Sequence, residues 1–72
     1  MYIVEFYTYG STSIDFRTVS NQVVDEVVIE KLFTELYDSV EYFIEQDKDN
    51  HYIIYCDKSI GAYVYNVDLS LS

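Results

Sequence analysis

The chain has 72 residues and carries 13 acidic against 4 basic side chains, a net charge of -9. Half of the residues are hydrophobic and 18% are aromatic, which excludes a disordered acidic tail, because such tails are poor in aromatic residues. With two glycines, no proline and therefore no visible linker, the length predicts one acidic domain spanning residues 1–72.

The first part of the chain predicts two paired strands. Residues 2–9 are rich in β-branched and aromatic types, which favour strands. A turn signal follows at residues 10–12, and residues 13–19 then alternate between apolar and polar side chains, as in Ile14 and Asp15. This second segment is therefore predicted as a half-buried strand that forms a hairpin with the first.

The middle of the chain predicts one long helix. Ser20 and Asn21 are N-cap candidates, and the helical pattern continues from there to about Asp47. At helical spacing, eight apolar residues fall within one arc of about 140°: Ile29, Leu32, Phe33, Leu36, Tyr37, Val40, Phe43 and Ile44. Four valines between residues 23 and 28 lie off this arc, so the first turns are expected to be extended or to pack elsewhere.

The last part predicts two further strands, residues 51–57 and 62–69, because apolar and aromatic residues alternate along both. The order ββαββ predicts an α+β domain in which one long helix packs on one face of a four-stranded, mainly antiparallel sheet. Since one helix covers only one face, the other face must meet water or a partner.

Negative charge is concentrated in residues 25–49, which we call the acidic segment. It holds nine acidic residues against two lysines, a net of -7. On a helix, carboxylates one to two turns apart can stand in for the phosphates of a nucleic acid and can steer a basic partner. The candidate contact residues are Glu30, Glu35, Asp38, Glu41 and Glu45. The alternative is a solvated helix face whose acidity favours solubility.

Nine tyrosines form a second candidate surface. Several fall on strand faces opposite the predicted core, where an amphipathic ring suits a boundary between apolar and wet surroundings. The candidate partner-binding residues are Tyr7, Tyr9, Tyr55, Tyr63 and Tyr65. The alternative is ordinary strand composition, because aromatic residues suit pleated, half-buried surfaces.

The sequence predicts neither a catalytic nor a metal centre. Counted from Asp47, a calcium loop would need Gly and Glu at the positions that Tyr52 and Lys58 occupy. Cys56 and His51 fall on opposite sides of one strand, which separates the only conventional nucleophile and base. A phosphate-binding glycine loop is also missing from the sequence. We therefore expect a protein that is not an enzyme and needs no cofactor.

Charge also limits the partners. A nucleic acid or an anionic bilayer would be repelled, so direct binding to either is not expected. The first residues lack the basic region of a signal peptide, and no apolar run approaches the roughly 20 residues of a membrane span. With a lone cysteine, Cys56, the expected location is cytoplasmic. A homodimer is a further expectation, because association enlarges the core of a small domain.

In size, charge and predicted element order, the chain resembles the small acidic inhibitors encoded by phages and other mobile elements, including anti-CRISPR and anti-restriction proteins and uracil-DNA glycosylase inhibitors. The resemblance implies a non-catalytic DNA mimic that acts in the host cytoplasm. Its partner would be a basic nucleic-acid-binding protein, such as a CRISPR nuclease, a restriction enzyme or a repair enzyme. The alternative is a small protein–protein interaction module or subunit, either monomeric or dimeric, that binds its partner through a tyrosine-rich sheet face.

Overall fold

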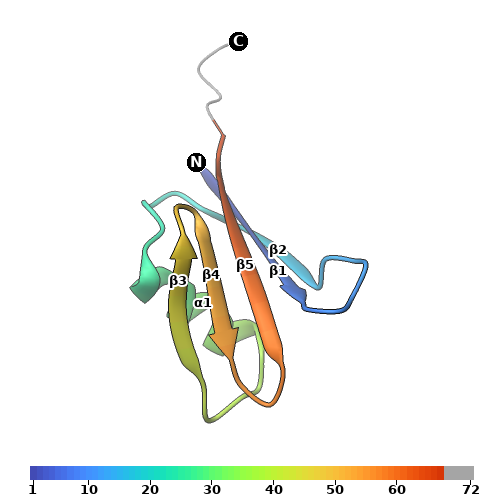
Figure 1. Cartoon of the computed structure of the whole chain (residues 1–72). Helices are drawn as coiled ribbons and strands as arrows, with labels where there is room; N and C mark the ends of the chain where they lie inside the picture. Colours follow the sequence, from blue (N-terminus) through green and yellow to red (C-terminus); the bar gives the residue numbers. More distant parts are fainter. Residues whose placement is uncertain (68–72) are drawn as a thin grey trace.

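The computed structural model describes residues 1–67 and contains one helix and five strands (Figure 1). In chain order these are β1 (Tyr2–Thr8), β2 (Phe16–Ser20), α1 (Glu26–Leu36), β3 (Phe43–Lys48), β4 (His51–Tyr55) and β5 (Ser59–Asn66). The α+β class is confirmed. The predicted order ββαββ with four strands is wrong, because a further strand, β3, follows the helix. Residues 68 and 69 of the predicted last strand lie outside the described part of the chain.

The five strands form one antiparallel sheet in the order β2-β1-β5-β4-β3. Its centre joins the first strand to the last, with Val4 opposite Val64. The predicted hairpin of the first two strands is present, and β3, β4 and β5 form a meander beside it. In Figure 1, α1 lies behind β3 and β4, so the helix covers one face of the sheet.

The helix starts later than the sequence predicts. Asp25, rather than Ser20 or Asn21, is the N-cap, and its carboxylate accepts a hydrogen bond of 3.0 Å from the Val28 N–H. Ser20 instead ends β2 and accepts a hydrogen bond from the Gln22 N–H. The valines at the start of the predicted helix explain part of the shift, because β-branched residues are weak helix formers.

The helix also ends eleven residues early, at Leu36 rather than at about Asp47. Residues 43–48 form β3 because Asp49 and Asn50 make a tight turn that folds this segment back onto β4. Asn50 adopts a left-handed backbone conformation, φ 64°, which Asn tolerates better than most residues. Ile44 then lies opposite Ile54. Strand pairing therefore overrides the helical spacing of Phe43 and Ile44.

The core lies between α1 and the sheet. Ile29 and Phe33 of the helix pack against alternate residues of the central strands. The buried strand residues are Val4, Phe6, Tyr52, Ile54, Ile60, Ala62 and Val64. Tyr37, just beyond the helix, closes one end of this core with its ring 5.0 Å from that of Phe33, and its hydroxyl donates a hydrogen bond to Asp15. Burial and the nearby Asp15 raise the pKa of Tyr37.

Candidate functional site

The sheet face away from α1 gathers tyrosine side chains from three strands. Tyr7 of β1, Tyr55 of β4, and Tyr63 and Tyr65 of β5 project from it, and Tyr9 follows directly after β1. We call this surface the tyrosine-rich face. Its rings are in contact, since Tyr7 and Tyr63 stack at 5.5 Å between centroids and Tyr63 and Tyr65 lie 6.4 Å apart. All five tyrosines that the sequence singles out therefore share one surface.

A glycine lets the most central tyrosine lie flat. Gly61 of β5 stands opposite Tyr7 in the sheet, and a Cβ added at Gly61 would overlap the Tyr7 ring. Glycine inside a strand often marks such a close approach. The absence of a side chain at this position allows Tyr7 to reach across β5 toward β4.

A line of hydrogen bonds anchors this ring. His51 of β4 contacts the Asp47 carboxylate through Nδ1 at 3.1 Å and the Tyr7 hydroxyl through Nε2 at 3.0 Å. The carboxylate can only accept, so in neutral His51 Nδ1–H donates to Asp47 and Nε2 accepts the proton of Tyr7. Burial raises the pKa of Tyr7, and the neighbouring phenol groups of Tyr9 and Tyr63 add to this effect. Its hydroxyl therefore stays a donor.

His51 is only 3% exposed although no helix of residues 1–67 covers this face. The ring of Tyr63 lies 4.3 Å from the imidazole and shields it together with Tyr7. Asp47 reaches His51 because β3 has a register irregularity between Gln46 and Lys48, of the kind that re-aims a side chain. Sequence reasoning missed this role of His51. The available signal was the position of Asp47 and His51 on either side of the Asp49-Asn50 turn.

A shallow hollow opens at one end of the tyrosine-rich face. Its volume is about 290 Å³, and it is lined by Tyr9, Ile53, Tyr55 and Ser59. The Tyr55 hydroxyl donates to Glu45 at 3.2 Å, and this hydrogen bond is the main reason why the pKa of Tyr55 is raised. Both Tyr9 and Tyr55 remain half-exposed. A carboxylate thus stands beside an aromatic hollow.

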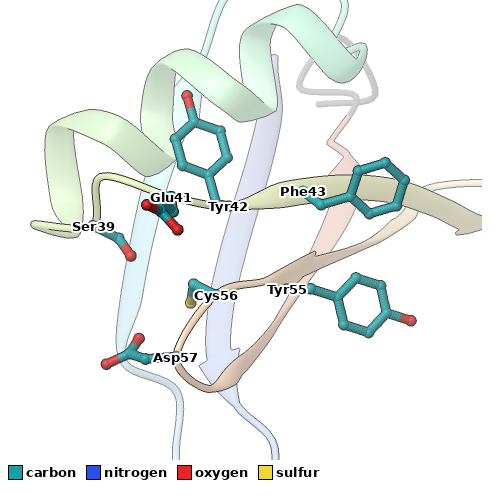
Figure 2. A pocket seen from close by; sticks show the side chains of 7 residues that line it. All are labelled: Ser39, Glu41, Tyr42, Phe43, Tyr55, Cys56 and Asp57. Atoms are coloured by element: carbon teal, nitrogen blue, oxygen red, sulfur yellow. The ribbon is translucent and has the colours of Figure 1, made fainter.

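A larger hollow of about 520 Å³ lies where the α1–β3 connection meets the end of β4 (Figure 2). Figure 2 shows Tyr55 and Phe43 pointing to one side of it, Tyr42 pointing toward the helix, and Cys56 between them and Asp57. The Cys56 thiol donates to the Lys58 carbonyl, and Cys56 packs against the core, on the other side of the strand from His51. In residues 1–67, no three candidate metal ligands come together.

The five acidic candidates do not share one helical face. Glu30 and Glu35 lie on α1, Asp38 and Glu41 lie in the connection that follows, and Glu45 lies on β3. Glu45 stands opposite Ile53 and so belongs to the tyrosine-rich face. The prediction of a single acidic helix face is wrong, because the helix ends at Leu36. All five side chains are nevertheless exposed.

Within residues 1–67, no lysine or arginine pairs with a carboxylate of the acidic segment, and Asp47 contacts His51. Within the described residues, the only ion pair of a lysine or arginine joins Arg17 to Glu5 at 2.6 Å, outside the acidic segment. Glu30 instead accepts a hydrogen bond of 2.8 Å from the Tyr42 hydroxyl. The negative field of α1, the connection and β3 is therefore open to a basic partner.

The fold and these surfaces define a small α+β domain with one open, aromatic sheet face and an acidic flank. No helix in the described range has the length and apolarity needed to cross a membrane. Comparison of the chain with models of protein families, with curated proteins and with solved structures finds no match.

Proposed function

We propose that this chain is a non-catalytic protein–protein interaction module that binds a basic protein through the tyrosine-rich face. The observation that supports this proposal best is the convergence of five tyrosines on the sheet face that the helix leaves open. Tyrosine supplies a large, amphipathic contact area and is enriched among the residues that dominate binding energies.

The arrangement of this face is organised before any partner arrives. The contacts of Tyr7 with His51, Tyr63 and Gly61 restrict the central rings, and Tyr9, Tyr55 and Tyr65 extend outward from them, half-exposed. Side chains that are already ordered lose less conformational entropy on binding, which favours affinity. The central rings therefore serve as a rigid base for the exposed ones.

Charge selects the kind of partner. Glu45 accepts a hydrogen bond from Tyr55 at the edge of the hollow between Tyr9 and Tyr55. An arginine side chain suits this position, because its stem packs on Ile53, its guanidinium stacks on tyrosine rings, and its donors can reach a carboxylate. The net charge of -9 favours the approach of such a basic protein and opposes acidic ones.

The test begins with affinity capture from the native host lysate and continues with the purified captured protein. The double variant Tyr9→Ser/Tyr55→Ser should lose binding by about tenfold or more. Val40→Ser is the matched control, because Val40 is 92% exposed and lies in the α1–β3 connection. Equal binding by the double variant, or equal loss in the control, would contradict the proposal.

A second candidate function is an inhibitor that competes with nucleic acid for the basic surface of a nuclease or repair enzyme. The exposed carboxylates of the acidic segment, which no lysine or arginine pairs with in residues 1–67, support it. Four of the five candidates, those on α1 and its connection, would make the contacts: Glu30, Glu35, Asp38 and Glu41.

This second function has its own experiment. The variant Glu30→Gln/Asp38→Asn/Glu41→Gln should weaken binding and flatten its salt dependence, and excess duplex DNA should displace the partner from the unmodified protein. Glu45→Gln is the comparison, because Glu45 lies on the tyrosine-rich face. If duplex DNA does not displace the partner and the triple variant binds it normally, competition with nucleic acid is ruled out.

A further inference from the structure

The two outer strands of the sheet, β2 and β3, differ in how their free edges are protected. In residues 1–67, β2 pairs only with β1 and β3 pairs only with β4. An unpaired edge exposes backbone donors and acceptors that can pair with another strand, and proteins usually block it with charges or irregularities.

The β3 edge is blocked in both ways. Its register is irregular between Gln46 and Lys48, and it carries Glu45 and Asp47, followed by Asp49 in the turn. A second β3 placed alongside would bring these carboxylates against their copies. Like charges on facing strands destabilise a pair. Self-association through β3 is therefore opposed.

Within the described residues, the β2 edge has neither a register irregularity nor a row of carboxylates. Its five residues, Phe16–Ser20, contain a single charged side chain, Arg17, whose guanidinium is held by Glu5 of the neighbouring strand. Apolar side chains are exposed on both sides of the strand, since Phe16 is 38% and Val19 56% exposed. Val19 projects on the tyrosine-rich face, in one row with Ile3 and Tyr65. This edge has the features of a pairing template.

The charge distribution also favours this edge. Among the first 24 residues, Glu5, Asp15 and Arg17 are the only charged side chains, whereas the acidic segment carries a net of -7. That segment includes β3, which lies at the opposite end of the strand order from β2. Two copies that meet at β2 therefore keep their β3 edges as far apart as the sheet permits, which minimises repulsion between two chains of charge -9.

We propose that two copies of this chain associate by antiparallel pairing of β2 with β2, about a two-fold axis at Thr18. Such a contact is isologous, so each residue meets its counterpart by symmetry. Thr18 lies opposite Thr18 of the second copy, and Phe16 lies opposite Ser20. On the other face, Val19 lies opposite Arg17, whose aliphatic stem can cover it. A Thr–Thr pair across strands is a favourable one.

This dimer leaves the tyrosine-rich face uncovered. Because the axis is perpendicular to the sheet, the two five-stranded sheets join into one, and both tyrosine-rich faces lie on the same side. The inference does not depend on the proposed function, since the edge and the face are different surfaces. If the face does bind a partner, the dimer presents two binding sites to one extended target and raises avidity.

Sulfhydryl cross-linking tests the register. In a Cys56→Ser background, Thr18→Cys should form an intermolecular disulfide on mild oxidation, because facing Cβ atoms in such pairs lie about 4.5–5.5 Å apart. Gln46→Cys, an exposed position on the β3 edge, is the matched control and should cross-link far more slowly. Equal rates at the two positions would overturn the β2 register.

Sedimentation tests the dimer without any cysteine. The unmodified chain should show a concentration-dependent shift from its 8.5 kDa monomer to a dimer. Val19→Lys, which places two cations side by side, should remain monomeric with an unchanged circular dichroism spectrum, whereas Val40→Lys should still dimerise. A monomer at every concentration up to about 1 mM, or a dimer that Val19→Lys leaves intact, contradicts the proposal.

Discussion

The two faces of the sheet are ordered by different interactions. On the face toward α1, side chains such as Phe6 and Ile54 are completely buried and are held by close apolar packing against the helix. On the tyrosine-rich face, no second layer of structure lies over residues 1–67, yet His51 is almost as deeply buried, beneath tyrosine rings and between two hydrogen-bond partners. A small domain can thus order an open face through aromatic stacking and a short polar network.

The largest difference between the faces should appear when one phenylalanine is truncated on each. Phe6→Ala removes a completely buried ring of β1 and should lower the free energy of unfolding by about 3–5 kcal/mol. Phe43→Ala removes a ring that is 64% exposed beside Tyr55, and should change the free energy of unfolding by less than about 0.5 kcal/mol. Urea denaturation measures both. Similar losses in the free energy of unfolding for the two variants would contradict this difference between the two faces.

Gly61→Ala should cause the next largest effect, because its Cβ would overlap the Tyr7 ring. The ring must move away from His51, and such overpacking costs about 1–3 kcal/mol. In the Tyr7→Ala background the space is free, so adding Gly61→Ala should cost little further. A double-mutant cycle by urea denaturation gives this coupling. Additive effects would mean that Tyr7 does not determine the need for glycine.

Tyr7→Phe should have a smaller effect, because the ring stays and only its hydroxyl is lost. His51 Nε2 then lacks its partner, and the loss should be about 1 kcal/mol. Tyr2→Phe, on the helix side of the same strand, is the comparison. The His51 side-chain NMR signals should shift in the first variant only. Unchanged imidazole signals after Tyr7→Phe would exclude the hydrogen bond.

Alkaline pH should lower the stability of the fold through the tyrosine hydroxyls. Burial raises the pKa of Tyr7, Tyr37 and Tyr52, and carboxylate hydrogen bonds raise the pKa of Tyr42 and Tyr55. The unfolded chain therefore loses these protons first, at its ordinary pKa of about 10. Stability from these groups is fully present below that pH and falls as pH rises above it. Phenolate absorbance and urea denaturation between about pH 8 and pH 11 check this; stability that is constant across the range contradicts it.

The strands that alternate cleanly could be predicted from the sequence. Period-two spacing in residues 51–57 suffices to place Tyr52 and Ile54 on one face and His51 and Tyr55 on the other. The shared face of the five tyrosines follows from the same rule. These features depend on residues that are close together in the chain, so the local sequence pattern predicts them.

The acidic helix face and the His51 network could not be predicted in this way. Phe43 and Ile44 fit a helical arc, and only their pairing with β4 across the Asp49-Asn50 turn makes them part of a strand. The partner of His51 is Tyr7, 44 residues earlier in the chain. Such contacts depend on the strand order, which brings β1 beside β5 and so within reach of β4. Local spacing contains no information about that order.

The pairing of β1 with β5 also determines when the sheet can be completed during synthesis. Among the five strands of residues 1–67, β1 leaves the ribosome before the others, but its inner neighbour, β5, is made after the other four. The β1–β2 hairpin and the β3–β4 hairpin can each form early, yet the middle of the sheet joins only after residue 66 has emerged. Since the core spans that junction, folding must wait for nearly the whole domain, and the long loop closure should make it slower than folding of a helical domain of equal size.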